Sequence, residues 1–131
     1  LKARIAQVRH LEFGETVGYD ATWTARRPTR LAIVCMGYAD GIFRSVSGDD
    51  QKPGGTLFVG GKPCPIVGRI SMDLLALDIT HLPDGSVKRG DFATMIGAER
   101  DVDATAAMLG TIGYEVLTNL GPRFARVYRG G

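Results

Sequence analysis

The stretch TLFVGGKPCPIV, residues 56–67, decides the fold class of this chain. Two short runs rich in apolar residues, 56–59 and 64–67, flank the pair Gly60-Gly61. Glycine takes positive φ at little cost, and both central residues of a two-residue hairpin turn need positive φ. The stretch therefore predicts an antiparallel β-hairpin.

Further strands are predicted on both sides of this hairpin. Apolar or alternating runs of five to seven residues recur between Gly and Pro signals, and the chain contains 18 glycines. These runs are residues 4–10, 31–36, 74–79, 92–96 and 123–129. The runs LAIVCM (31–36) and LLALDI (74–79) are continuously apolar or nearly so, which favours strands buried on both faces. The last run alternates and is predicted to be a closing strand. Short strands at this spacing are typical of an all-β barrel or sandwich.

A small helical segment is predicted late in the chain. Residues 101–109 are Ala-rich, with Asp101 or Asp103 as a candidate N-cap and Gly110 as a stop. Residues 111–119 predict a second short helix. The segments 48–55 and 81–90 are expected to be loops. The sequence thus predicts one domain, mostly β, with little helix.

Size and charge narrow the class of protein. A chain of 131 residues is one domain by length. The net charge of +2 argues against a nucleic-acid module, and no apolar run approaches the roughly 20 residues that span a bilayer. The start lacks the apolar stretch of a signal peptide, and its first residue is not Met, so we expect a piece of a longer chain.

Metal chemistry has little support in the sequence. His10 and His81 are isolated, and we interpret them as surface or turn residues. Cys35 and Cys64 are expected to be small core residues in a reducing compartment. No metal site is predicted.

Four segments differ from ordinary strand-and-turn sequence. Three of the four tyrosines lie beside a glycine in them, at the end of a predicted strand or helix. The segments are VGYDATW (17–23), GYADG (37–41), VGRISMD (67–73) and IGYEV (112–116). A tyrosine beside a glycine is also common packing at the rim of a barrel, so this pattern alone leaves a shared site open.

In this order and at these spacings, the four segments resemble the C-terminal domain of the pyridoxal-phosphate-dependent alanine racemases. The resemblance extends from KARI (2–5) to RVYRG (126–130) and so covers the domain 1–131. It implies a mostly β fold with a six-stranded Greek-key barrel-like core, extra hairpins and one or two short helices near the C-terminus. It also implies an N-terminal TIM-barrel domain that bears the cofactor lysine and is absent here.

The resemblance also implies roles for individual residues. Tyr19 matches the catalytic tyrosine that exchanges a proton with the α-carbon of L-alanine. Met72 matches the methionine whose backbone N–H binds the substrate carboxylate, and Tyr114 matches a tyrosine that hydrogen-bonds the cofactor phosphate. The substrate entrance corresponds to Tyr38, Arg44, Arg69 and Ile112. In this family the domain lends such residues to the barrel of the partner subunit, so the enzyme is a homodimer.

One residue departs from the family pattern beside the catalytic position. The family often has Gly where this chain has Asp20, and a nearby carboxylate disfavours tyrosinate. A free tyrosine has a pKa of about 10, so a base at neutral pH needs roughly 4 kcal/mol of tyrosinate stabilisation. The nearest cations in sequence are Arg26 and Arg27, seven and eight positions beyond Tyr19. We therefore expect the acidifying partner to come from the missing barrel.

The cofactor lysine is also missing. The four lysines, Lys2, Lys52, Lys62 and Lys88, lie in no segment that resembles the cofactor motif. We therefore expect pyridoxal phosphate only in the full-length enzyme and no activity from this chain alone. The resemblance implies a cytoplasmic enzyme that interconverts L- and D-alanine for peptidoglycan synthesis.

Three alternatives remain at this point. A racemase of the same family acting on another amino acid, such as serine, has its side-chain pocket partly in the missing barrel. A stand-alone β-barrel binding or assembly module without catalysis is the alternative from another class, and a lysine motif upstream in the full-length protein would exclude it. The related domain of fold-type III amino-acid decarboxylases lacks the VGYDATW segment, so Tyr19 weighs against it.

Overall fold

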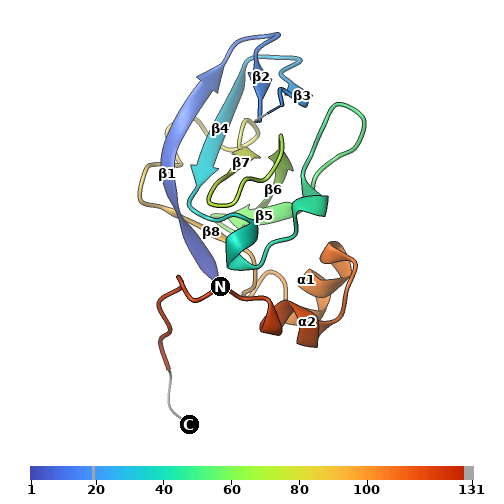
Figure 1. Ribbon diagram of the computed structural model, residues 1–131. Helices are drawn as coiled ribbons and strands as arrows, with labels where there is room; N and C mark the ends of the chain where they lie inside the picture. The colour runs from blue at the N-terminus through green and yellow to red at the C-terminus, as the bar shows by residue number, and fades with distance from the viewer. Residues whose placement is uncertain (19, 129–131) are drawn as a thin grey trace.

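A closed antiparallel β-barrel forms the body of the molecule. The computed structural model describes residues 1–18 and 20–128. Six strands close the barrel in the order β1-β4-β7-β6-β5-β8 (Figure 1). Their bounds are Lys2–Leu11 (β1), Thr29–Val34 (β4), Thr56–Val59 (β5), Lys62–Val67 (β6), Leu75–Asp78 (β7) and Phe92–Thr94 (β8). The predicted barrel-like core of six strands is confirmed.

The hairpin that decided the fold class is present. Val59 pairs with Lys62, which leaves Gly60 and Gly61 as the two turn residues. Their φ values are +57° and +78°, so both occupy the left-handed region that the turn requires. The hairpin fixes the register between β5 and β6, and with it the alternation of inward and outward side chains.

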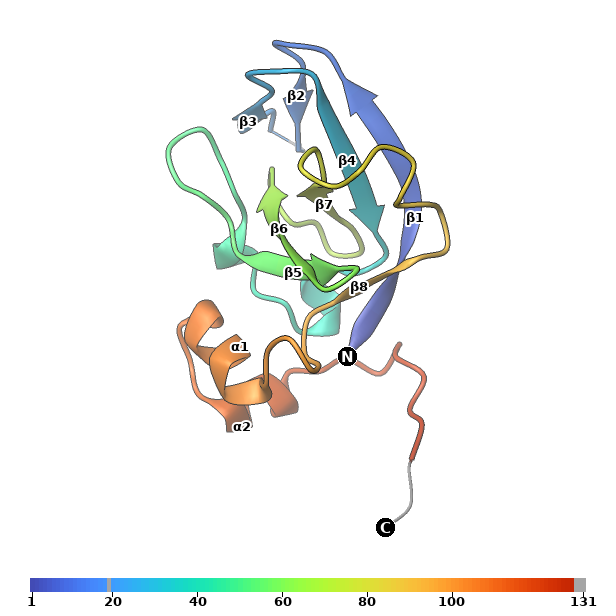
Figure 2. The same ribbon diagram turned by 180° about the vertical axis from the view of Figure 1, so that it is seen from behind.

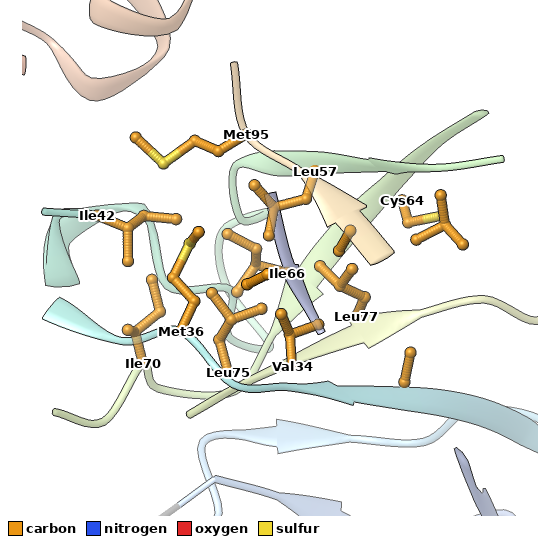
Figure 3. Packing of buried hydrophobic residues seen from close by; sticks show 14 of the residues in the cluster. Val34, Met36, Ile42, Leu57, Cys64, Ile66, Ile70, Leu75, Leu77 and Met95 are labelled. Carbon is orange, nitrogen blue, oxygen red and sulfur yellow. The ribbon is translucent and has the colours of Figure 1, made fainter. Parts of the chain in front are cut away.

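The barrel interior is filled by aliphatic and sulfur-containing side chains (Figure 3). Leu57, Ile66 and Leu77 from neighbouring strands are at most 1% exposed. All four residues of β7 are buried, as expected for a continuously apolar run. The packed interior makes the barrel a rigid support rather than a channel.

Smaller elements lie at the two ends of the barrel. The short strands β2 (Thr16–Val17) and β3 (Trp23–Thr24) pair at one end. Helices α1 (Val102–Leu109) and α2 (Gly113–Thr118) lie at the other end, as both views show (Figures 1 and 2). Neither helix in the described part of the chain is long and apolar enough to cross a membrane.

Helix α1 begins and ends where the sequence predicts. The Asp101 carboxylate accepts a hydrogen bond of 2.8 Å from Ala104 N, and Gly110 ends the helix with φ +75°. The capping aspartate satisfies one of the free N–H groups of the first turn. The second predicted helix, expected at 111–119, is also present as α2.

The predicted closing strand at 123–129 is wrong over residues 123–128, and residues 129–131 lie outside the described part of the chain. The barrel is already closed, because β8 pairs with β1 on one side and with β5 on the other. No strand edge of the barrel is left for a seventh strand to join. Arg123 instead turns its side chain toward two carboxylates described below.

One cysteine prediction is also wrong. Cys64 is buried, but Cys35 is exposed. Val34 and Met36, on either side of Cys35, are buried. Side chains alternate between the two faces of an extended segment, which points Cys35 away from the interior. His10 and His81 are both exposed, as predicted.

Candidate functional site

A 3₁₀ turn carries the first candidate residue, Tyr38. The turn spans Tyr38–Asp40 directly after β4 and its short extension, and it appears in teal in Figure 1. The buried Asp40 carboxylate accepts a hydrogen bond of 3.0 Å from Gly37 N, which caps the turn. Gly41 ends it with φ +108°. Tyr38 is left 48% exposed beside the barrel.

The segment of Met72 lies against this turn. Tyr38 N donates to Ser71 O at 3.0 Å, and Ala39 N donates to Met72 O at 3.2 Å. Gly37 lies so close to this segment that a Cβ there would overlap the carbonyl groups of Ser71 and Met72. Two segments far apart in sequence are therefore held together by backbone contacts.

Met72 presents both its side chain and its backbone to the surroundings. The residue is 51% exposed. Among residues 1–18 and 20–128, its N–H donates no hydrogen bond, whereas its carbonyl accepts two, from Ala39 N and Arg123 Nη2. A backbone N–H without a protein acceptor is a ready donor for a ligand carboxylate.

Four predicted residues are brought together around one cavity. Tyr38, Arg44, Arg69 and Met72 line a cavity of about 570 Å³, together with Ile70 and Ser71. Arg44 begins a second 3₁₀ turn, Arg44–Val46, and Arg69 lies in the segment that follows β6. Two guanidinium groups and a free N–H favour a small anionic ligand.

Arg69 also forms an ion pair. Its Nη1 lies 2.6 Å from Oδ2 of Asp20, and both side chains are nearly half exposed. Gly18 packs closely on the same segment, because a Cβ on Gly18 would lie 2.9 Å from Arg69 N. Both residues that flank Tyr19 in the chain therefore contact a residue that lines the cavity.

Tyr19 itself lies outside the described residues. The sequence alone suggested that the Asp20 carboxylate would disfavour a tyrosinate at Tyr19, and the structure changes this expectation. The negative charge of Asp20 is not isolated, because the Arg69 guanidinium compensates it, which leaves Arg44 as the cavity arginine that is not paired with Asp20. Sequence distance suggested Arg26 and Arg27 as the nearest cations, whereas folding brings Arg69 to Asp20.

The two remaining candidates lie elsewhere. Ile112 and Tyr114 stand at the start of α2 and are 66% and 81% exposed. Within the described part of the chain, neither lines the cavity that holds Tyr38 and Met72. Their exposure leaves them free to contact another domain.

Sequence reasoning assigned no role to an arginine that joins two of the motifs. Arg123 donates from Nε to Asp40 Oδ1 at 2.8 Å and from Nη2 to Asp40 Oδ2 at 2.7 Å. Its Nη1 donates to Asp73 Oδ1 at 2.5 Å. These hydrogen bonds raise the pKa of Arg123 above its ordinary value, those to Asp40 most strongly. The sequence offered no signal for this role, because Arg44 and Arg69 are the arginines nearest to Asp40 and Asp73 along the chain.

The described residues do not fit the covalent attachment of pyridoxal phosphate. Attachment needs a lysine in the cavity, and no lysine lines it. All four lysines are exposed, and one of them, Lys52, lines a neighbouring hollow with Arg44 and Arg69. No group of three or more His, Cys, Asp or Glu residues in the described part of the chain could hold a metal ion.

Fold and site together define a closed β-barrel domain with an exposed cavity, lined by residues of the Tyr38 turn and of the segment that follows β6. The sequence pattern of the family described as "Alanine racemase, C-terminal domain" matches residues 1–128, and the chain belongs to this family.

Similar proteins support this assignment. The chain is 49% identical to an alanine racemase of Methylobacterium sp. (strain 4-46) and 46% identical to one of Brucella ovis, each over 98% of this chain. It spans 34% and 31% of their lengths, so it corresponds to about a third of these relatives.

Two solved structures resemble the fold closely. One is an alanine racemase from Bartonella henselae with covalently bound pyridoxal phosphate, with a TM-score of 0.89 and 38% identity over 98% of this chain and 34% of that one. The other is the biosynthetic alanine racemase from Pseudomonas aeruginosa, with a TM-score of 0.86 and 40% identity over 99% of this chain and 34% of that one.

Proposed function

We propose that residues 1–131 form the C-terminal domain of an enzyme that interconverts L- and D-alanine. The observation that carries this proposal is the cavity that joins Tyr38, Arg44, Arg69 and Met72 next to the residues flanking Tyr19. The alanine racemases found by comparison are 28–49% identical to this chain, which supports the same reaction. An N-terminal TIM-barrel domain supplies the cofactor lysine.

Met72 binds the substrate carboxylate, and Arg44 and Arg69 line the substrate entrance. The Arg44 guanidinium orients an incoming amino acid by its carboxylate end, whereas Arg69 is paired with Asp20. The Met72 N–H then donates a hydrogen bond to the carboxylate. Tyr38 narrows the entrance with its half-exposed ring.

Tyr19 holds and moves the proton on one face of the substrate. Its hydroxyl group exchanges a proton with the α-carbon of L-alanine, while a lysine of the barrel domain serves the other face. Pyridoxal phosphate, when bound by the whole enzyme, supplies the electron sink at the α-carbon. On this chain Tyr114 contributes a hydroxyl to the cofactor phosphate, and Ile112 lines the outer entrance.

The complete site is shared between two subunits. This domain contributes its residues to the barrel of the partner subunit, so the active enzyme is a homodimer. Its product D-alanine serves peptidoglycan synthesis, which places the enzyme in the bacterial cytoplasm. No nucleic acid or membrane takes part.

The test compares the full-length protein with the isolated chain. The full-length protein is assayed with L-alanine and L-serine by circular dichroism, with pyridoxal phosphate present. We expect racemisation of alanine with a kcat/KM at least about 10-fold above that for serine. The hydroxyl group of serine would lie in a pocket shaped for a methyl group, and such a mismatch costs at least this factor. The isolated chain should be inactive and should bind no stoichiometric cofactor.

Two results would contradict the proposal. Preference for serine would reassign the substrate within the same family. A full-length protein without any racemase activity, but with an intact fold, would favour a binding or assembly module.

A further inference from the structure

Arg123 joins the two segments that line the cavity, although it does not line the cavity itself. It binds the Asp40 carboxylate through two parallel hydrogen bonds of 2.8 and 2.7 Å. It binds Asp73 through a third hydrogen bond of 2.5 Å. Bidentate contacts between guanidinium and carboxylate fix direction as well as distance.

Each carboxylate belongs to a different segment, and each segment also carries a residue that lines the cavity. Asp40 closes the Tyr38 turn, and its side chain is only 5% exposed. Asp73 directly follows Met72, and Arg123 Nη2 also lies 3.4 Å from Met72 O. Arg123 is 83 residues from Asp40 and 50 from Asp73, so only the folded chain brings the three together.

We propose that Arg123 is a positioning residue that fixes the Met72 backbone against the Tyr38 turn, so that the Met72 N–H keeps its place for a substrate carboxylate. This inference rests on the proposed function of Met72. Arg123 acts through Met72 rather than by touching the substrate, because it lines a neighbouring hollow with Cys35, Leu74 and Phe124.

An effect of charge and an effect of position predict opposite changes in carboxylate binding for the variant Asp73→Asn. Asp40, Asp73 and Arg123 together carry one net negative charge at neutral pH. Asp73→Asn removes that charge, so an effect of charge alone would tighten the binding of a carboxylate. The same substitution removes one anchor of the Met72 segment, so a positioning effect would weaken that binding.

The experiment uses the full-length enzyme and propionate, which keeps the carboxylate of alanine but has no amino group. The variants are Arg123→Gln, Arg123→Lys and Asp73→Asn. Arg30→Gln is the matched control, because Arg30 binds the carbonyl groups of Thr80 and Leu82 away from the cavity. Inhibition constants, KM, kcat, cofactor absorbance and Tm are measured for each protein.

We expect Arg123→Gln to raise the propionate inhibition constant and the KM for alanine together by about 10-fold, since charge-assisted hydrogen bonds are lost. Arg123→Lys keeps the positive charge but cannot form the two parallel hydrogen bonds to Asp40. It should raise the inhibition constant and the KM by about 3-fold. Asp73→Asn should raise both by about 3-fold as well. In all three, kcat and cofactor absorbance should change little, and Arg30→Gln should lower only Tm.

Two results would overturn the proposal. A lower Tm with unchanged propionate binding, as in the control, would make Arg123 a purely structural residue. Unchanged or tighter propionate binding in Asp73→Asn would show that charge, not position, is what matters. If Arg123→Gln does not fold, Arg123→Lys and Asp73→Asn test the proposal by the same criteria.

A backbone substitution separates this inference from the proposed function. Replacing the amide N–H of Met72 by an ester oxygen removes the donor and leaves the side chain in place. If the ester leaves propionate binding unchanged, the proposed role of Met72 fails. If the ester weakens binding but the Arg123 and Asp73 variants do not, only the positioning role of Arg123 fails.

Discussion

The ion pair between Asp20 and Arg69 sets the charge next to Tyr19. Asp20 directly follows Tyr19 in the chain, and its carboxylate lies 2.6 Å from the Arg69 guanidinium. Paired, the two side chains add no net charge at the residue that follows Tyr19. Each single substitution leaves one of them uncompensated, so the two substitutions should act in opposite directions.

The pH dependence of the full-length enzyme tests this account. Asp20→Asn leaves a free cation that favours tyrosinate, so the acidic limb of kcat/KM for L-alanine should shift to lower pH by up to about one unit. Arg69→Gln leaves a free carboxylate and should shift that limb to higher pH. Asp91→Asn, at an exposed position outside the cavity, is the control. Shifts in the same direction for both variants would contradict the account.

The two cysteines should react very differently with thiol reagents. Burial raises the pKa of the Cys64 thiol to about 11, whereas Cys35 is exposed. Only the thiolate reacts, and at pH 8 about one in a thousand thiols with that pKa is ionised. We expect one fast equivalent from Cys35 with iodoacetamide and slow reaction of Cys64 until the chain unfolds. A fast equivalent that survives Cys35→Ser would contradict this.

The same thiol should affect stability in alkali. Its pKa is raised in the folded chain, so its contribution is complete below the unfolded pKa, about 8.5, and is lost as pH rises toward the folded value of about 11. Stability should therefore fall over this range. Urea unfolding of Cys64→Ala at several pH values should show a smaller fall.

At the scale of elements, the contact between the Tyr38 turn and the Met72 segment depends on Gly37. A Cβ at Gly37 would overlap the carbonyl groups of Ser71 and Met72, so Gly37→Ala must separate the two segments. We expect a loss of about 1–3 kcal/mol in urea unfolding, together with weaker alanine binding in the full-length enzyme.

Gly85→Ala provides the matched control. Gly85 has φ +76°, and a Cβ added there would meet no atom within 4 Å, so its substitution strains only the local backbone, by about 1 kcal/mol. It lies in the loop after β7, and it should leave substrate binding unchanged. Equal effects of the two substitutions on binding would refute the role of the close contact at Gly37.

The elements show what sequence could and could not predict. The turn at Gly60-Gly61 and the cap at Asp101 are local signals, so both were predicted correctly. The strand at 123–129 was not, because alternation says nothing about whether a strand edge is available. Barrel closure by β8 is a long-range property that no local pattern reveals.

The candidate site likewise contains residues that the sequence could predict and one that it could not. Tyr38, Arg44, Arg69 and Met72 were predicted through the family resemblance, and the structure brings them to one cavity. Arg123 was missed, because its partners are 50 and 83 residues away. Likewise, sequence proximity made Asp20 an uncompensated charge, while the folded chain pairs it with Arg69.

At the scale of the whole molecule, several large apolar side chains are exposed, some at the cavity and some at the start of α2. Tyr38, Met72, Leu74, Ile112 and Tyr114 are between 44% and 81% exposed. An apolar surface of this kind is typical of a contact with another domain. The barrel domain is that contact in our proposal, so two copies of this chain lack their main interface.

We therefore expect the isolated chain to be a monomer in sedimentation velocity at micromolar concentration. The full-length protein should sediment as a dimer under the same conditions, which is the positive control. A tight dimer of the isolated chain at nanomolar concentration would show that this domain pairs with itself and would contradict the account.

The central claim is that this domain supplies one of two bases, and hydrogen exchange with Tyr19→Phe tests it most directly. The substitution removes only the hydroxyl group, so the full-length enzyme should keep its fold and its cofactor absorbance. Alanine is incubated in deuterium oxide, and loss of the α-hydrogen is followed by NMR for each enantiomer. We predict that racemisation falls by at least about 100-fold in both directions, since each turnover needs both bases. Exchange from D-alanine should persist, while exchange from L-alanine is lost. Equal loss of exchange from both enantiomers would contradict the assignment and make Tyr19 a positioning residue.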